Sequence, residues 1–517
     1  MRTLVLSVSL LSVSVAIGQT PKPPDPTKEK KESKPKGYPD KLIHAPTPMP
    51  DRVILTWSGN TATTQSVTWR TDTTVTTAVG QITEATDGPS FDAGWGGKKV
   101  SDVVRSVPAI TEPLKTDLNA SHRHSVTFRG LKPKSKYAYR VGAGADWSEW
   151  FQFETTADKP EPFGFIYVGD AQNDVRRHWS RLIRQAVADM PDAKFLLHAG
   201  DLINRGYSDA DWGEWYQAMG WVTGGYRHVV TPGNHEYGSA PKGLILAPKA
   251  VDGEVPPKAG KKKGGVTSYW RPQFTLPDHG PKGLEETCYY LDIQGMRLIV
   301  LNSMERLEDQ VPWLENVLKT NPHKWVVVAF HVPAYSTAAN RQKNEENKAV
   351  RKLWRPILDR YGVDLVLQGH DHSYGRSGLM RNDTVLPNGE EYDKKGSVYV
   401  VSVSGPKMYP VGQQPWMMSF AEKKQLYQLI RIDGDRLHFQ ARTANGNLFD
   451  EFELRKKSDG RSELLERSAI EAEKAGSGSP VGRDALFALG GIVLLAGGYA
   501  VVRSGRRNGN RASGCVA

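Results

Sequence analysis

Five short apolar runs between residues 163 and 372 each end in a compact polar cluster, and this pattern limits the possible folds more than any other feature. The runs read "FGFIYVGD", "AKFLLHAGD", "HVVTPGNHE", "KWVVVAFH" and "VDLVLQGHDH". Amphipathic stretches over residues 175–190, 209–219 and 347–362 lie between some of them. Strands that alternate with helices predict an α/β layered domain over residues 159–456, in which ligands bind beyond the carboxyl ends of the strands.

The residue types in these clusters point to metal chemistry. Alone, a Gly-Asp pair or a single histidine in a loop is more often structural. Together, carboxylate and amide oxygens mixed with imidazole nitrogens suit first-row metal ions, and one shared carboxylate bridges two ions about 3.5 to 4 Å apart. We expect Gly369 to let the backbone turn tightly where the last run ends. The polar residues of these clusters are Asp170 and Gln172; Asp201, Asn204 and Arg205; Asn234, His235 and Glu236; His331; and His370 and His372.

A different texture precedes this domain. Residues 48–158 contain short, alternating segments rich in Val, Thr and aromatic residues, separated by turn residues, which predicts an antiparallel all-β sandwich. The stretch "VTFRGLKPKSKYAYRVG" resembles a fibronectin type III-like module. That resemblance implies that Leu131, Pro133 and Tyr137 form a turn with the tyrosine packed beneath it.

The order of the polar motifs resembles the calcineurin-like metallophosphoesterases. The N-terminal sandwich, "TSYWRPQFTLP" and "GPKMY" are similar to the purple acid phosphatase-like branch of that family, over about residues 51–455. The resemblance implies two divalent or trivalent ions, with Fe, Zn and Mn all compatible. Asp201 would bridge them, and Gln172 would either complete the shell of the first ion or orient its ligands. Asp170 and His372 would bind the first ion, and Asn234, His331 and His370 the second.

The resemblance also implies catalytic and substrate-binding residues. His235 would lie over the site and either hydrogen-bond the substrate or protonate the leaving oxygen. Arg205 would grip a phosphate oxygen, because a guanidinium fork matches phosphate geometry. Asn204, expected at the substrate, stands where purple acid phosphatases place the tyrosine that gives them their colour, so we expect no purple colour. Arg341 follows where the plant enzymes have a histidine pair, and it is either a substrate contact or an exposed loop arginine.

The two ends of the chain predict its location. Residues 1–18 resemble a secretory signal peptide, and residues 19–47 form a linker rich in Pro and Lys. Residues 457–484 are expected to form a stalk before an apolar transmembrane helix at 485–502 and a basic cytoplasmic tail at 503–517. The protein would thus be held at the cell surface or in the periplasm.

Charge and cysteine content fit an exported enzyme. Much of the surplus behind the net charge of +11 falls in tails and loops, so no nucleic-acid partner is expected. The proposed anchor would separate Cys288 from Cys515, which should not pair. The favoured function is hydrolysis of small-molecule phosphate esters. The alternative is a surface binding or adhesion protein whose metal domain is structural.

Overall fold

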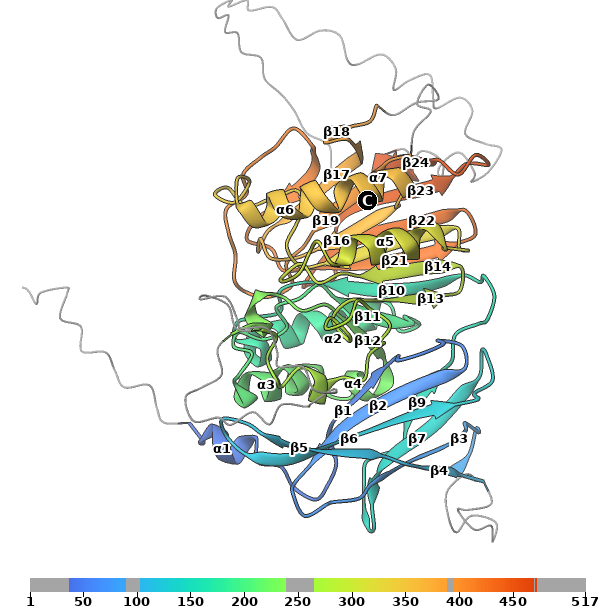
Figure 1. Cartoon of the computed structure of the whole chain (residues 1–517), viewed down its shortest axis with the longest axis vertical. Coiled ribbons are helices and arrows are strands. Elements are labelled where there is room, and N and C mark those ends of the chain that lie inside the picture. The colour runs from blue at the N-terminus through green and yellow to red at the C-terminus, as the bar shows by residue number, and fades with distance from the viewer. Residues whose placement is uncertain (1–36, 90–102, 239–264, 388–394, 469, 472–517) are drawn as a thin grey trace, which may run out of the picture.

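The computed structural model describes residues 37–89, 103–238, 265–387, 395–468 and 470–471, and they form two β-rich lobes (Figure 1). The N-terminal lobe is a sandwich of two antiparallel sheets. Its interior contains fully buried Leu55, Trp69, Phe128 and Tyr139. One sheet contains β1 (Asp51–Thr56), β2 (Thr64–Thr71), β6 (Ala120–Arg129) and β5 (Ile110–Lys115). The other contains β4 (Arg105–Pro108), β3 (Val79–Glu84), β7 (Lys136–Ala143), β8 (Asp146–Trp147) and β9 (Phe151–Glu154).

The second lobe has two central sheets. In the first, β10 (Phe163–Val168), β11 (Phe195–His198) and β12 (Arg227–Val230) are parallel, and β21 (Leu426–Asp433), β22 (Arg436–Thr443), β23 (Leu448–Lys456) and β24 (Ser462–Glu466) continue it antiparallel. In the second, β14 (Met296–Val300), β15 (Trp325–Phe330), β16 (Leu365–Gln368) and β19 (Ser397–Val401) are parallel. Antiparallel β13 (Tyr289–Ile293) and β17 (Tyr374–Arg381) flank them, with β18 (Thr384–Val385) and β20 (Met417–Ala421) beside β17.

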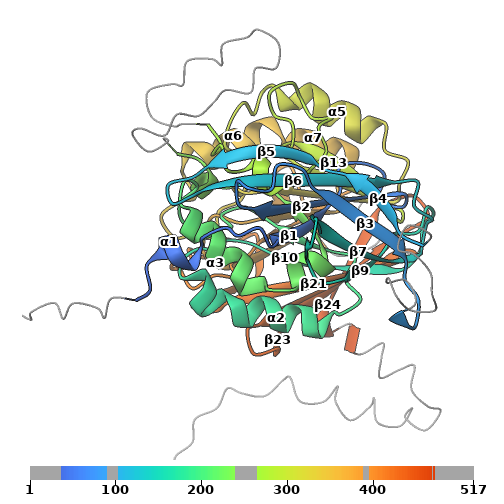
Figure 2. The ribbon, with the colours of Figure 1, turned by 90° about the horizontal axis from the view of Figure 1, so that it is seen from below.

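Helices cover the outer faces of this pair of sheets. Figure 2 shows α5 (Gln310–Lys319), α6 (Glu345–Leu353) and α7 (Arg355–Tyr361) on one side, and α2 (Ser180–Asp189) and α3 (Asp209–Met219) on the other. The alternation of strand residues explains these layers: Leu298 and Val300 pack toward the first sheet, while Ile299 packs with the helices α5 and α7. Shorter segments are η4 (Val175–Trp179), α4 (Val222–Gly225), η5 (Asn234–Glu236) and η6 (Arg271–Gln273).

The two lobes share one continuous sheet. Strand β1 of the sandwich pairs in parallel with β12, where Leu55 stands opposite Arg227, so that eleven strands run through both lobes. A buried ion pair of 2.6 Å between Arg52 and Asp209 also joins them. The sequence predicted two successive domains, and the chain does pass from one to the other between β9 and β10. It did not predict that their sheets join.

The structure corrects both flanking segments. The linker predicted at 19–47 ends in a short helix, α1 (Asp40–Ile43), and in His44, which is only 4% exposed and packs against Gly213 of α3. The stalk predicted at 457–484 begins within the folded lobe. There β24 extends the first sheet and buries Leu464, because Asp459-Gly460 forms a turn that brings the chain back along β23.

The predictions for the signal peptide, the membrane helix and the cysteines concern the two ends of the chain and Cys288. The signal peptide at 1–18, the membrane helix at 485–502, the basic tail and Cys515 lie outside the described residues. Within the described ranges, no helix has the length and apolar character needed to span a bilayer. Cys288 is a buried free thiol.

Candidate metal centre

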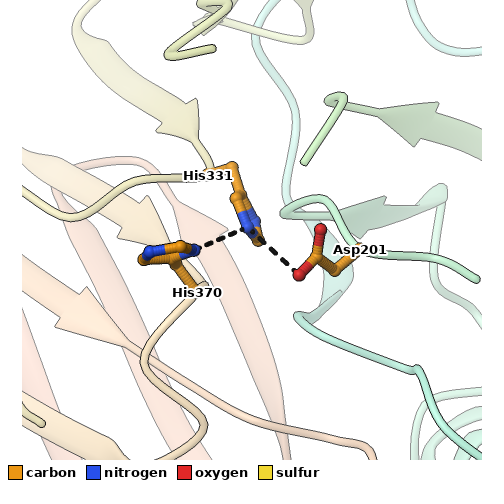
Figure 3. A group of neighbouring side chains, drawn as sticks. All are labelled: Asp201, His331 and His370. Atoms are coloured by element: carbon orange, nitrogen blue, oxygen red, sulfur yellow. Dashed lines mark hydrogen bonds and ion pairs between the residues drawn. The ribbon is translucent and has the colours of Figure 1, made fainter. Parts of the chain in front are cut away.

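The polar clusters converge because the parallel strands of both sheets end at one edge of the lobe. Asp201 follows β11, His331 follows β15 and His370 follows β16. The ligand atoms of these three side chains lie within 4.8 Å of one another (Figure 3). Asp170, which follows β10, and His372 form a second group with the same Asp201, again within 4.8 Å. The shared carboxylate is the one that the sequence predicted to bridge two ions.

Two amide side chains complete these groups. Asn234 Oδ1 lies 2.8 Å from His370 Nδ1 and 3.2 Å from His331 Nε2, so it joins the group of Asp201, His331 and His370. Gln172 Nε2 lies 2.7 Å from Asp201 Oδ2 and 3.1 Å from His372 Nε2. The Oε1 atom of Gln172 is buried without a hydrogen-bond partner. Rotating the amide by half a turn exchanges its two ends, and Gln172 can then offer an oxygen to a cation in the second group.

Each histidine is oriented by a hydrogen bond from its outer nitrogen. His331 Nδ1 donates to the carbonyl of Ala199 at 2.8 Å, and His372 Nδ1 donates to the carbonyl of Lys407 at 3.0 Å. The outer nitrogen of His370, Nε2, lies 3.1 Å from a carboxylate oxygen of Glu346. A proton on each outer nitrogen leaves the inner nitrogen with a free lone pair, as a metal ligand requires. No pattern in the sequence indicated these partners.

The backbone at the ligands adopts a conformation that is rare for non-glycine residues. The φ angles of Asp170, Asp201, His370 and His372 are 51°, 53°, 74° and 49°. Such left-handed residues cost about 1 to 3 kcal/mol each and cluster at functional sites. Gly369 was expected to make a tight turn, but the positive φ falls on the next residue. Glycine is required at 369 for space, since a Cβ there would lie 2.5 Å from Asp170 Oδ2.

Buried carboxylates make the site favourable for positive charge. Burial raises the pKa of Asp170 well above its usual range, and the neighbouring Asp201 adds to that shift. Burial lowers the pKa of His331, but the Asp201 carboxylate outweighs burial and raises it to about 10. Burial lowers the pKa of His372 to about 3, so this imidazole is neutral. Either a proton on His331 or a metal cation therefore balances the carboxylates.

Glu236 holds the loop that carries the bridging carboxylate, and sequence reasoning gave it no role. Its side chain is fully buried and accepts the backbone N–H groups of Asp201, Leu202, Ile203 and Gly233 at 2.9, 2.8, 3.4 and 2.7 Å. Burial and the Asp201 carboxylate raise the pKa of Glu236, while the hydrogen bonds from the backbone of Gly233 and Asp201 oppose that shift. Its place in the motif "GNHE" was the only available signal.

His235 lies beside the centre with one nitrogen free. Its Nδ1 donates to the carbonyl of Asn204 at 2.6 Å, and its backbone N–H donates to Asp201 Oδ1 at 2.8 Å. The other ring nitrogen, Nε2, lies 3.9 Å from Asp201 Oδ2, and the side chain is 23% exposed. His235 can therefore present Nε2 to a molecule that enters the site from solvent.

The three remaining predicted residues lie at different distances from the ligands. The side-chain oxygen of Asn204 accepts from Asn173 Nδ2 at 2.9 Å. The Arg205 side chain is 67% exposed, and its guanidinium binds Asp211 at 2.7 Å. Arg341 donates to the carbonyl of His370 at 3.2 Å and so borders the centre. Their roles in substrate binding stay predictions.

The donor set fits two metal ions. Imidazole nitrogens with free lone pairs, a shared carboxylate and two amide side chains supply the mixed nitrogen and oxygen ligands that first-row metals prefer. The buried Oε1 of Gln172 has no hydrogen-bond partner among the described protein atoms, and a cation in the second group would satisfy it once the amide is rotated. One ion would be held by Asp170, Asp201 and His372 with Gln172, the other by Asp201, Asn234, His331 and His370.

Comparisons with known proteins agree with this geometry. A family profile described as calcineurin-like phosphoesterase matches residues 164–374, and one described as purple acid phosphatase, N-terminal domain, matches residues 50–155. Purple acid phosphatase 21 of Arabidopsis thaliana is 29% identical over 282 residues, which are 53% of this chain and 57% of that protein. Mouse acid phosphatase type 7 is 26% identical over 331 residues, covering 60% of this chain and 68% of that protein.

The similarity extends to a solved structure. Purple acid phosphatase PPD1 from yellow lupin seeds superimposes with a TM-score of 0.62 over 80% of this chain and 75% of that one, at 17% identity. At this identity the likeness establishes the fold alone, and it confirms the predicted pairing of an N-terminal β domain with a metallophosphoesterase domain. The chain spans 57% and 59% of the length of the first two curated relatives.

Proposed function

We propose that this chain, which belongs to the purple acid phosphatase-like metallophosphoesterases, hydrolyses small-molecule phosphate esters at a dinuclear metal centre on the outer side of a membrane. The observation that carries the proposal is the position of Asp201. Its carboxylate belongs to both ligand groups, each within 4.8 Å. A purely structural ion needs no shared carboxylate, whereas two-metal hydrolases use one to hold two ions about 3.5 to 4 Å apart.

The residues of the chain divide the work around that centre. Two bound ions supply positive charge for the phosphoryl oxygens and lower the pKa of water. Asp201 would hold both ions through its shared carboxylate, and the outer hydrogen bonds of His331 and His372 fix the direction of their inner lone pairs. His235 keeps its Nδ1 proton on the Asn204 carbonyl, so Nε2 is the atom that accepts or delivers a proton at the leaving oxygen.

Arg205 requires a movement to take part. Its guanidinium is held by Asp211 and Ser208. Because this ion pair is largely exposed, it costs only about 0 to 1 kcal/mol to open. A phosphate group competes for the same fork with a stronger, bidentate geometry. Arg205 would thus bind substrate only after it leaves Asp211, and Arg205→Ala should raise KM without loss of metal.

The test is phosphate release from p-nitrophenyl phosphate and bis-p-nitrophenyl phosphate, measured with Fe, Zn or Mn and with chelator. Asp201→Asn should abolish turnover and reduce the bound metal measured by elemental analysis. Asp192→Asn is the matched control, because its partner Arg431 lies on the surface. Unchanged turnover in Asp201→Asn, or no turnover with any metal, would refute the proposal and favour a binding role.

The location is a separate part of the proposal. It is supported by the apolar run at 485–502 and by the signal-like residues 1–18. The full chain should sediment with membranes and be digested by protease added outside intact cells, whereas a chain that ends at residue 484 should be released in soluble form. A full chain found only in the soluble fraction would contradict anchoring.

A further inference from the structure

Two cationic side chains flank one aromatic ring beside the metal ligands. The guanidinium carbon of Arg341 lies 5.1 Å from the centre of the Tyr409 ring, and Lys407 Nζ lies 5.6 Å from it. The same ring meets the imidazole of His372 edge-on, with 4.8 Å between ring centres. Arg341, Lys407 and Tyr409 thus form a cluster, called here the cationic rim, one side chain away from the centre.

The cationic rim is tied to two predicted metal ligands by the backbone. Tyr409 N donates to the carbonyl of His372 at 3.0 Å, and the Lys407 carbonyl accepts from His372 Nδ1 at 3.0 Å. Arg341 Nη1 donates to the carbonyl of His370 at 3.2 Å. Because these contacts use main-chain atoms of Lys407 and Tyr409, their side chains are positioned by the ligands and remain free to bind.

The rim carries positive charge that its surroundings only partly offset. Arg341 lies 3.9 Å from Asp371, but that carboxylate also receives the backbone N–H of Thr337 at 2.7 Å. Among the described residues, Lys407 forms no ion pair with a carboxylate, and its ammonium lies over the Tyr409 ring. The Arg341 side chain is 26% exposed, and Lys407 and Tyr409 are half-buried. The cations therefore border solvent at the mouth of the centre.

We infer that the cationic rim is a specificity subsite for a second anionic group, a carboxylate or a phosphate, on the leaving group of the substrate. This inference rests on the proposed hydrolysis of phosphate esters. The face of the Arg341 guanidinium packs on an aromatic ring, so the N–H groups that do not bond the His370 carbonyl remain available to an anion. Lys407 adds a flexible ammonium on the same ring. Substrates with a neutral leaving group bring no anion to either cation.

The kinetic test compares phenyl phosphate with 3-carboxyphenyl phosphate, which differ by one carboxylate. Phosphate release should favour the carboxylated substrate by about tenfold in kcat/KM, mainly through KM, since a charge-assisted hydrogen bond contributes roughly that factor. Arg341→Gln/Lys407→Gln should bring the ratio close to one. Lys423→Gln, a change of a lysine that is 85% exposed, should keep the ratio of the unmodified protein.

A binding measurement separates the rim from catalysis. Calorimetry with benzylphosphonate and 3-carboxybenzylphosphonate, whose P–C bonds resist hydrolysis, should show about tenfold tighter binding of the carboxylated compound to metal-loaded protein, and no such preference in the double variant. Equal affinity of the unmodified protein for both compounds would overturn the inference, even where phenyl phosphate is hydrolysed. Loss of all turnover with the affinity difference intact would instead refute the proposed function and leave the subsite standing.

Discussion

Glu236→Gln tests whether the loop that carries the bridging carboxylate depends on a buried negative charge. Glutamine has nearly the same shape, but one of its two terminal atoms donates rather than accepts. Glu236 Oε2 accepts from Asp201 N and Gly233 N, and Oε1 accepts from Leu202 N and Ile203 N. Whichever oxygen becomes an NH2 group, two backbone donors then face a donor.

The expected loss follows from those two hydrogen bonds. A hydrogen bond to a charged group contributes about 1.5 to 3 kcal/mol, so the variant should lose about 3 to 6 kcal/mol of unfolding free energy. The loss should extend to metal affinity, because the Asp201 backbone is one of the groups released. Metal-loaded protein is the proper sample, because burial and the Asp201 carboxylate together raise the pKa of Glu236 to about 8, and bound cations would offset the part due to Asp201.

Urea unfolding followed by tryptophan fluorescence measures the loss, and elemental analysis after dialysis measures retained metal. Glu161→Gln is the matched control: it changes the same residue type in a surface ion pair with Lys134, and should leave the free energy of unfolding nearly unchanged. A loss in Glu236→Gln as small as that of the control would mean that Glu236 is neutral in the folded protein. The account of the loop would then be wrong.

Three further predictions concern packing, pH and the C-terminal strand. Gly369→Ala should cost about 1 to 3 kcal/mol and weaken metal binding, because its Cβ would lie 2.5 Å from Asp170 Oδ2; full metal retention in dialysis would contradict this. Burial lowers the pKa of His228 to about 3, and His198 is shifted in the same direction. As the pH falls below about 6.5, these histidines are protonated in the unfolded chain but not in the folded protein. The free energy of unfolding therefore decreases between about pH 6.5 and pH 3. Between pH 7.5 and 5.5, each imidazole should lower the free energy of unfolding by about 1.4 kcal/mol. His228→Asn should therefore reduce this pH-dependent decrease, measured by urea unfolding, by that amount. An unchanged decrease would refute the assignment. In a chain that ends before β24, the buried Arg376 guanidinium keeps Asp450 but loses Glu466. The free energy of unfolding should fall by about 1.5 to 3 kcal/mol or more in thermal or urea unfolding. If residues 457–484 formed a free stalk, the same truncation would leave stability unchanged.

The sequence predicted which candidate ligands lie together because the signals for them are local. Each ligand cluster directly follows an apolar strand, and parallel strands of one sheet end at the same edge. The shared position of Asp201 follows from this arrangement, since β11 lies between β10 and β12. No long-range information is needed to expect that such residues meet. The sequence did not predict that His331 and His370 come from a second sheet. They follow β15 and β16, which pair in the sheet that packs against the first one.

The missed features depend on pairs that are distant in the chain. Glu346 of α6 reaches His370, and β1 of the sandwich reaches β12, with no pattern in either segment to indicate the partner. Strand β24 was missed because its charged residues resemble a solvated stalk. Its turn residues, Asp459-Gly460, were a usable hairpin signal. A charged segment therefore does not mark the end of a domain when a hairpin turn, such as Asp459-Gly460, precedes it and its polar and apolar residues alternate.

Two separate physical requirements explain why glycine precedes aspartate, asparagine or histidine at this centre. One is the lack of space for a Cβ at the glycine, and the other is the backbone conformation of the residue that follows. Gly233 and Gly369 are needed because a Cβ would meet Asp201 Oδ1 at 2.3 Å or Asp170 Oδ2 at 2.5 Å. The ligand that follows Gly369, His370, takes the left-handed conformation itself. Crowding and strain therefore fall on neighbouring positions, and a substitution at either one should disturb the other. Because the two positions depend on each other, a glycine directly before a candidate ligand indicates the metal centre better than the ligand residue does by itself.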